Sequence, residues 1–249
     1  MSLNRRLFGL GALAAIGGGI SRRGLAVDQR SDKSAAARPG SANEAPANPA
    51  PAAAVPVAVL LDQGATVIDF AGPWEVFQDA EAANVPGFRL FTVAASKAPL
   101  RATAGLQLVP DYSFDDAPDA RVIVMGAQGG NSNPAKIAWI RKASEKAEIV
   151  LSVCTGAFLL ARTGLIDGMN ATTHHDFYDQ FEHAFPKVHL VRDRRFVDNG
   201  KFITAGGLTS GVDAALHVVA HFYSESAARA VATYMEHDGN GWVSGVRDI

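Results

Sequence analysis

The residue with the clearest chemical potential is Cys154, the one cysteine of the chain. It follows the apolar, strand-like run 149–153 and precedes Thr155-Gly156, where a helix is expected to begin. Unpaired amides and the positive end of a helix stabilise an anion at such a strand-to-helix turn. We therefore expect the pKa of the thiol to lie below its ordinary value of about 8.5, as in a nucleophile elbow. The alternative is that Cys154 is an inert, buried small hydrophobe.

Asp69 is the second candidate, because it precedes a helix that is predicted to open at Gly72-Pro73. A carboxyl group that is partly desolvated beside a sulfur atom has a raised pKa and can act as a general acid and then as a general base. An acid just before a helix can also act only as a helix cap, and that alternative stays open. Trp74, directly after Pro73, is expected either to line the pocket or to pack in the core.

The histidines form two groups. His174 and His175 follow two threonines, and both a direct role beside the cysteine and a structural role near the site are open. His217 and His221 stand four residues apart and could in principle hold a metal ion, but no HExxH context accompanies them. We therefore expect His217 and His221 to share one face of an interior helix, and we expect no metal.

Composition restricts the classes of function that these residues can serve. The chain has 249 residues, with 23 Lys and Arg against 25 Asp and Glu. A nucleic-acid binder needs clustered basic surface, so the net charge of −2 disfavours that class. The hydrophobic share of 48% supports a sizeable core, and the length allows one domain or at most two. A single cysteine excludes an internal disulfide and a cysteine-rich zinc site.

The N-terminal residues differ in composition from the rest of the chain. Residues 1–26 combine Arg5-Arg6 with a short Gly- and Ala-rich apolar run, which predicts a Tat-type signal segment and a periplasmic or secreted protein. A membrane anchor or an amphipathic arm is the alternative, although the run is too short and too rich in glycine for a permanent span. Residues 27–56 are rich in Ala and Pro and are predicted to form a disordered linker.

The folded domain is expected at residues 57–236, with a loose C-terminal tail at 237–249. Continuous apolar runs predict strands that are buried on both faces, and helical spacing predicts the segments between them. This alternation predicts a parallel sheet with helices on both faces. The predicted strands are 57–61, 88–93, 122–125, 149–153 and 202–205, and the predicted helices are 70–83, 134–146, 155–163 and one that Ser210 and Asp213 open as a capping box.

The predicted sheet brings the candidate residues to one edge. In such sheets, ligands bind beyond the carboxyl ends of the strands, because the loops that follow the strands gather there. Several of the chemically notable residues follow a predicted strand, and we therefore expect them to form one site. These residues are Asp69, Gly126-Ala127, Cys154 and Gly206-Gly207.

Five ordered motifs between Val57 and Glu236 resemble the ThiJ/PfpI superfamily, whose fold is related to that of the class I glutamine amidotransferases. The resemblance implies an α/β, flavodoxin-like three-layer sandwich with a mostly parallel central sheet and a nucleophile-elbow cysteine. It also implies a homodimer. The motifs are Asp69-Phe70-Ala71-Gly72-Pro73, Ser152-Val153-Cys154-Thr155-Gly156-Ala157, Gly164-Leu165-Ile166-Asp167-Gly168, Ala171-Thr172-Thr173-His174 and Thr204-Ala205-Gly206-Gly207.

The residue after the cysteine distinguishes groups within this superfamily. Members similar to the PfpI peptidase and to glyoxalase-like chaperones usually have His or Ala there, and Glu where this chain has Asp69. The pair Cys154-Thr155 together with Asp69 resembles the isonitrile hydratases and also the sensor domain of AraC-type regulators. Those regulators append a helix-turn-helix domain, for which we expect too little chain after Tyr223, so the regulator interpretation is disfavoured.

Similarity to the isonitrile hydratases implies a mechanism that needs no metal and no organic cofactor. Cys154 would attack the terminal carbon of the isonitrile to form a thioimidate, and Asp69 would act as general acid and base. Thr155 and the amide of Ala127 would stabilise developing charge. The expected partner is a small electrophilic molecule, with no nucleic acid and no stable membrane insertion after removal of the signal. The residues expected to border the substrate are Gly126, Ala127, Trp74, His174 and Gly206.

Two other functions on the same cysteine stay open. One is a glyoxalase- or deglycase-like enzyme acting on 2-oxoaldehydes, which Thr155 in place of histidine disfavours. The other is a non-catalytic redox-sensing or binding domain, in which Cys154 would oxidise to a sulfinic acid. The chain also departs from the usual Pro-Gly-Gly of the family by having Met125-Gly126-Ala127. A Cβ at a position with positive φ would be strained, so the oxyanion site is expected to shift if Ala127 adopts that conformation.

Overall fold

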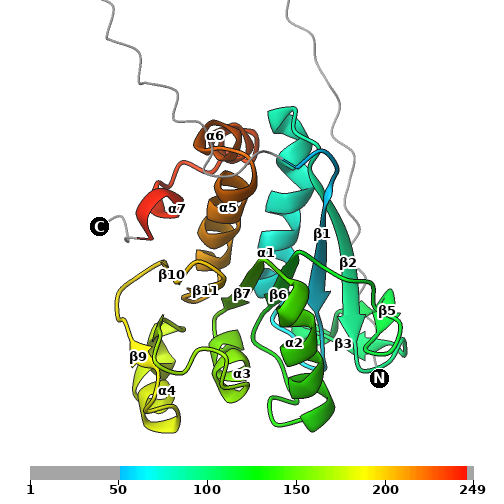
Figure 1. Cartoon of the computed structure of the whole chain (residues 1–249), viewed down its shortest axis with the longest axis vertical. Coiled ribbons are helices and arrows are strands. Elements are labelled where there is room, and N and C mark those ends of the chain that lie inside the picture. Colours follow the sequence, from blue (N-terminus) through cyan, green and yellow to red (C-terminus); the bar gives the residue numbers. More distant parts are fainter. Residues whose placement is uncertain (1–50, 246–249) are drawn as a thin grey trace, which may run out of the picture. The chain divides into compact units, whose positions relative to one another are not determined.

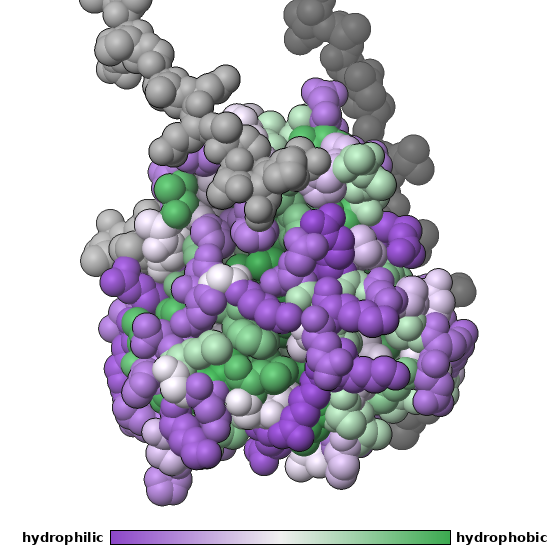
Figure 2. Space-filling view, in the orientation of Figure 1, coloured by the Kyte–Doolittle hydropathy of each residue, from purple (hydrophilic) through white to green (hydrophobic). Residues whose placement is uncertain are grey.

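A computed structural model describes residues 51–245 of the chain. The predicted signal segment, nearly all of the predicted linker and residues 246–249 lie outside the described residues. Within residues 51–245, no helix has the length and apolar character that a membrane span requires. Polar side chains cover most of the face in Figure 2, with apolar side chains visible in a band between them.

A mostly parallel sheet forms the centre of the described residues, which confirms the predicted fold class (Figure 1). Its strands lie in the order β10-β11-β7-β6-β1-β2-β5, and only the edge pair β10–β11 is antiparallel. The bounds are β1 (Val55–Leu60), β2 (Phe88–Ala94), β5 (Tyr112–Ser113), β6 (Val122–Met125), β7 (Ile149–Val153), β10 (Phe196–Asp198) and β11 (Phe202–Ala205). Two short pairs lie outside the sheet: β3 (Leu100–Arg101) with β4 (Gln107–Leu108), and β8 (Asn170–Ala171) with β9 (His189–Leu190).

Helices cover both faces of the sheet, so the domain has three layers. The central strand β1 explains this arrangement, because its alternate residues Val57 and Ala58 enter two separate apolar cores. The first core is closed by α1 (Val67–Gln78), α5 (Ser210–Phe222), α6 (Glu225–Tyr234) and α7 (Gly241–Ser244). The second core is closed by α2 (Pro134–Lys146), α3 (Gly156–Arg162) and α4 (Tyr178–Ala184).

The predicted elements differ from the observed ones mainly at their ends. β1 begins at Val55, inside the predicted linker, because Val55 is fully buried and pairs with β2. The predicted helix 70–83 is α1 followed by a 3₁₀ turn at Asp79–Ala83. Pro73 therefore lies inside α1 rather than near its start, and the carbonyl of Asp69 receives no helical hydrogen bond from it.

The predicted capping box at the start of α5 is wrong. The N-cap residue is Thr209, whose side chain makes no capping hydrogen bond, and Ser210 is the first helical residue. The carboxylate of Asp213 instead pairs with Arg195 and with His237, which are distant in sequence. A charged partner competes better for a buried carboxylate than a backbone amide of the same helix does.

The prediction of a loose tail from His237 onward is also wrong for the described residues 237–245. His237 Nε2 lies 2.9 Å from Asp213 Oδ1, and the backbone amide of Arg195 donates to the carbonyl of Gly245 at 2.7 Å. Between these contacts, Trp242 is buried in the first core. The polar sequence around Trp242 indicated a tail, but burial of one large aromatic side chain is enough to hold a short segment.

Candidate active site

Cys154 lies at the sharp turn between β7 and α3, as predicted. Its φ of +57° is a left-handed conformation that is costly for a residue with a Cβ. Two contacts hold the peptide there: the amide of Cys154 donates to the carbonyl of Gly206 at 2.8 Å, and Thr173 Oγ1 donates to the carbonyl of Cys154 at 2.8 Å. The turn is therefore fixed by segments from two other parts of the chain.

Asp69 is buried beside this turn and does not cap its own helix. It is the third residue of α1, and its Oδ2 accepts a hydrogen bond from the amide of Ala127 at 2.9 Å. A Cβ added to Gly126 would lie 2.6 Å from the Cβ of Asp69. Because that distance is too short for two carbon atoms, only glycine at position 126 lets α1 approach the end of β6 so closely. The capping alternative for Asp69 is thus excluded.

The ionisation of the two side chains is coupled. Burial raises the pKa of Asp69 to about 6, although hydrogen bonds from the amide of Ala127, the thiol of Cys154 and the amide of Leu208 oppose the shift. Burial and the negative charge of Asp69 raise the pKa of Cys154 to about 12. The prediction of a lowered thiol pKa is therefore wrong. Desolvation and a neighbouring carboxylate outweigh the amides of Thr155 and Leu208 that donate to the sulfur.

Leu208 supplies a backbone contact that the sequence did not predict. Its amide lies next to both the carboxylate of Asp69 and the sulfur of Cys154, and it lowers the pKa of each group. It reaches this position with a φ of +53°, while its side chain remains partly exposed. A leucine carries no sequence signal for such a conformation, which glycine or asparagine would usually indicate. Two strained residues, Cys154 and Leu208, thus meet at one carboxyl group.

Ala127 differs from the expectation in its backbone conformation and in the partner of its amide. It does not adopt a positive φ, so its Cβ causes no backbone strain. Its amide, which was expected to stabilise charge on a substrate, already donates to Asp69. Gly206 likewise supports the cysteine: its carbonyl accepts from Cys154, and its amide donates to the carbonyl of Arg195 at 2.9 Å. Thr155 is the N-cap of α3, and its amide donates to the sulfur of Cys154.

The loop that carries Ala127 is anchored by a buried lysine. Lys136 Nζ donates to the carbonyl of Gly129 at 2.7 Å and pairs with a carboxylate oxygen of Asp62 at 2.6 Å. Burial lowers the pKa of Lys136, and the charge of Asp62 opposes that shift. At Gly130, which has a φ of +62°, a Cβ would lie 2.6 Å from the Asp62 carboxylate. This ion pair keeps the loop, and with it the Ala127 amide, in place.

The remaining candidate side chains have contacts with residues other than Cys154 and Asp69. His174 Nδ1 accepts from the amide of Asp176 at 3.2 Å, and its ring stacks on that of His175. Trp74 is partly buried and packs against the first core. Of the two histidines on α5, His217 bonds to Asp198 at 2.8 Å.

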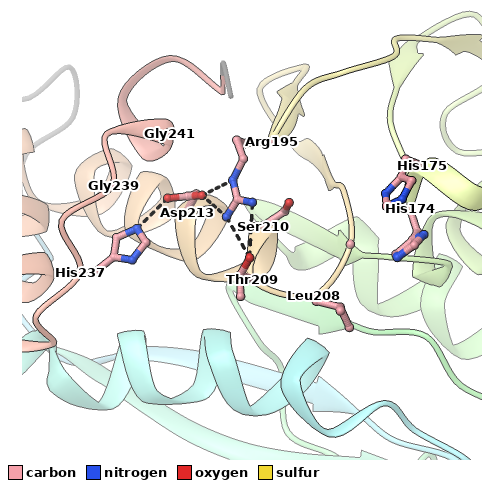
Figure 3. Close-up of a pocket in the computed structure, with 11 residues that line it drawn as sticks. His174, His175, Arg195, Leu208, Thr209, Ser210, Asp213, His237, Gly239 and Gly241 are labelled. Carbon is pink, nitrogen blue, oxygen red and sulfur yellow. Dashed lines mark hydrogen bonds and ion pairs between the residues drawn. The ribbon is translucent and has the colours of Figure 1, made fainter. Parts of the chain in front are cut away.

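A polar cavity of about 440 Å³ lies at the start of α5 (Figure 3), and its wall includes Leu208, whose amide lies next to Cys154 and Asp69. Residues 207–210 form part of its wall, and Arg195 with Asp213 and the segments around His174 and His237 form the rest. Within residues 51–245, one group of side chains could hold a metal ion. It consists of His174, His175 and Asp176, whose ligand atoms all lie within 4.8 Å of one another.

Comparison with known proteins agrees with this geometry. The DJ-1/PfpI family matches residues 55–221. Isonitrile hydratase from Pseudomonas putida is 30% identical over 187 residues, which are 73% of this chain and 78% of that protein. The HTH-type transcriptional regulator GbdR from Pseudomonas aeruginosa is 28% identical over 148 residues, which are 58% of this chain and 40% of the regulator.

Solved structures show the same fold. A ThiJ/PfpI family protein from Pseudomonas syringae superposes with a TM-score of 0.67 at 28% identity, over 82% of this chain and 83% of that chain. DJ-1beta from Drosophila melanogaster superposes with a TM-score of 0.63 at 18% identity, over 74% of this chain and 98% of that chain. The second likeness concerns the fold alone.

Proposed function

The chain belongs to the DJ-1/PfpI family, and we propose that within it the protein is a cysteine-dependent hydratase that adds water to an isonitrile and releases an N-substituted formamide. The observation that carries this proposal is the Cys154–Asp69 pair, a buried thiol next to a buried carboxyl group that has no cationic partner among residues 51–245 and whose Oδ1 has no hydrogen-bond partner there. The similarity to isonitrile hydratase over most of the folded domain supports it.

The first step of the proposed reaction joins the thiol to the isonitrile. The terminal carbon of R–N≡C accepts both a nucleophile and a proton. Because the pKa of Asp69 is about 6 and that of Cys154 about 12, the resting pair near neutral pH is a carboxylate and a thiol. Asp69 takes the S–H proton while the sulfur bonds to the carbon, and then passes the proton to that same carbon. The product is the thioimidate R–N=CH–S–Cys154.

The second step releases the formamide. Water adds to the thioimidate carbon, and Asp69 accepts one proton from the water and passes it to the nitrogen, which gives the tetrahedral R–NH–CH(OH)–S–Cys154. The C–S bond then breaks and its electron pair returns to the sulfur, while Asp69 accepts the remaining hydroxyl proton and delivers it to the sulfur, so that the carbonyl forms and the thiol is restored. The products are R–NH–CHO and unchanged enzyme, so one water is consumed per turnover and no electrons are exchanged.

The backbone supplies the electrostatic stabilisation in this mechanism. The amides of Thr155 and Leu208 donate to the sulfur, where negative charge grows as the proton leaves. In a buried site such fixed donors act without reorganisation and are worth more than in water. The left-handed backbone at Cys154 and Leu208 is unfavourable by itself, but it places the amides of Thr155 and Leu208 next to the sulfur.

The similarity to GbdR supports a second candidate, a binding domain without turnover. A redox-sensing role has less support. Oxidation requires an exposed thiolate, whereas Cys154 is buried and its pKa is raised to about 12.

The deciding experiment assays the full chain with aryl and alkyl isonitriles and, separately, with methylglyoxal. We expect formamide from the isonitriles, no formamide with Cys154→Ala, and normal turnover with the control His183→Ala on the exposed surface of α4. The rate should fall below about pH 6, where Asp69 gains a proton and loses its basic form, and should stay level above it. Lactate from methylglyoxal would favour the glyoxalase function, and folded protein with no product from any isonitrile would reject the hydratase.

We further propose that the protein is exported. The paired arginines Arg5-Arg6 and the weakly apolar run that follows support this location. Cell fractionation should find the wild-type chain outside the cytoplasm and the variant with Arg5→Lys and Arg6→Lys inside it. Equal distribution of the two would reject export by the Tat route.

A further inference from the structure

The cavity at the start of α5 is rich in hydrogen-bond donors. Arg195, His174, His175 and His237 stand around it, and with Ser210 they are drawn in Figure 3. At about 440 Å³ it has the size of a small-molecule site.

The carboxylate in the wall does not cancel these donors, because its own oxygens are already occupied. Arg195 binds Asp213 Oδ2 through Nε and Nη2, and His237 Nε2 lies 2.9 Å from Asp213 Oδ1. The guanidinium has only weak further contacts, to Thr209 Oγ1 at 3.4 Å. Asp213 therefore orients Arg195 and leaves N–H groups of the guanidinium available to a ligand.

The opposite wall also presents a donor. His174 Nδ1 accepts a hydrogen bond from the amide of Asp176, so the neutral ring carries its proton on Nε2. The ring lies so close to Gly207 that a Cβ at position 207 would overlap it. Its edge is thus held against the loop 207–210, which forms part of the cavity wall and directly follows Gly206, the residue that binds the amide of Cys154.

Ser210 adds a hydroxyl group to the wall of the cavity. It is 2% exposed and lines the cavity, and in Figure 3 its hydroxyl points toward the space between Arg195 and the two histidines. That hydroxyl is not among the enclosed side-chain atoms that lack a hydrogen-bond partner, so it is open to the cavity and can donate to a ligand bound there.

We propose that this cavity binds the carboxylate group of a small ligand. A carboxylate can accept from Nη1 and Nη2 of Arg195 in place of their weak contacts with Thr209 Oγ1, and Ser210 and His174 supply further donors from two other sides.

The cavity also adjoins the proposed reaction site, and this part of the inference rests on the proposed function. The carbonyl of Cys154 is held by Thr173 and its amide by Gly206, and the residues that follow, His174 and Gly207, line the cavity. A substrate whose reacting carbon meets the sulfur can therefore place its substituent here. The inferred substrate class is an isonitrile that carries a carboxylate.

The test measures binding separately from turnover. Succinate and its neutral counterpart succinamide are titrated calorimetrically into the full chain, with EDTA present to keep metals off His174, His175 and Asp176. We expect succinate to bind at least about tenfold more tightly than succinamide, and Ser210→Ala to weaken succinate by about tenfold. The matched control is Ser144→Ala, because Ser144 is as buried as Ser210 but lies on α2, in the other helix layer.

The outcomes separate the two proposals. Equal affinity for succinate and succinamide, equal losses in both serine variants, or binding that EDTA abolishes would overturn the carboxylate site. If succinate binds as expected, to Cys154→Ala as well, but no isonitrile is turned over, only the hydratase fails. If both hold, isocyanoacetate should show a KM at least about tenfold lower than its methyl ester, with the difference lost in Ser210→Ala.

Discussion

Two buried aspartates near the same edge of the sheet have opposite surroundings. Asp69 lies in the first turn of α1 and Asp213 in the first turn of α5, and neither is more than 2% exposed. Asp69 meets a neutral thiol and two backbone amides, and its pKa is raised to about 6. Asp213 instead meets Arg195 and His237, one on each carboxylate oxygen.

The difference shows what separates a carboxyl group that transfers protons from one that organises structure. A buried carboxylate without a cation is held close to protonation, so it can accept and return a proton near neutral pH. A buried carboxylate with a guanidinium keeps its charge and orients its partner. In the proposed mechanism, the same residue type at similar helix positions thus transfers protons at Asp69 and orients a partner at Asp213.

The largest expected effect is on turnover when the uncompensated carboxyl group is lost. Asp69→Asn keeps an oxygen for the amide of Ala127 but removes the base, so we expect turnover to fall by about 10²- to 10⁴-fold. The measurement is the rate of formamide release under saturating isonitrile. Asp119→Asn, which removes an exposed carboxylate, serves as control. A residual rate within about threefold of wild type would remove Asp69 from the mechanism.

The same substitution should stabilise the fold. Because the pKa of Asp69 rises from 3.8 to about 6 on folding, the native state binds the extra proton between these pH values, and the stability that this gives is lost as pH rises through about 6. Two pKa units correspond to about 3 kcal/mol, so above that pH Asp69→Asn should gain up to about 3 kcal/mol. Urea unfolding checks this, and the gain should shrink as pH falls toward about 4. A gain that does not depend on pH would contradict the assigned cause.

Asp213→Asn should act in the opposite direction. The substitution removes the charge from two hydrogen-bonded contacts, and hydrogen bonds to charged groups contribute about 1.5–3 kcal/mol. Because Arg195 and His237 remain partly exposed and can be hydrated, we expect a loss of about 2 kcal/mol in the same urea measurement. Stabilisation here would show that the two aspartates do not differ as their surroundings indicate.

Features that depend on a short stretch of chain could be predicted from the sequence. The strands β6, β7 and β11 and the helix α2 have the predicted bounds, because continuous apolar runs and Pro134 are local signals. The turn at Cys154 was predictable for the same reason, since a buried strand runs directly into small residues. The proximity of Asp69 to Cys154 followed only from the shared sheet edge and the family resemblance.

Features that depend on distant contacts could not be predicted. The direction of the Cys154 pKa shift needs the degree of burial and the charge of Asp69, and neither is visible in the residues around the cysteine. The amide of Leu208 reaches the site through a conformation that leucine rarely adopts. Asp213 matched a local capping pattern, but partners 18 and 24 residues away bind it instead.

The smallest expected effect on stability distinguishes between His237 and Arg195, the two partners of Asp213. His237→Ala removes one hydrogen bond and leaves the Arg195 pair, so we expect a loss of about 1 kcal/mol. Because His237 leads directly into the segment that holds Trp242, the loss should appear first as faster amide hydrogen exchange in α7, while the sheet stays protected. His183→Ala on exposed α4 is the matched control. Faster exchange across β11 as well would mean that His237 supports the whole sheet edge, and no change in α7 would mean that Arg195 alone holds Asp213 and the C-terminal segment.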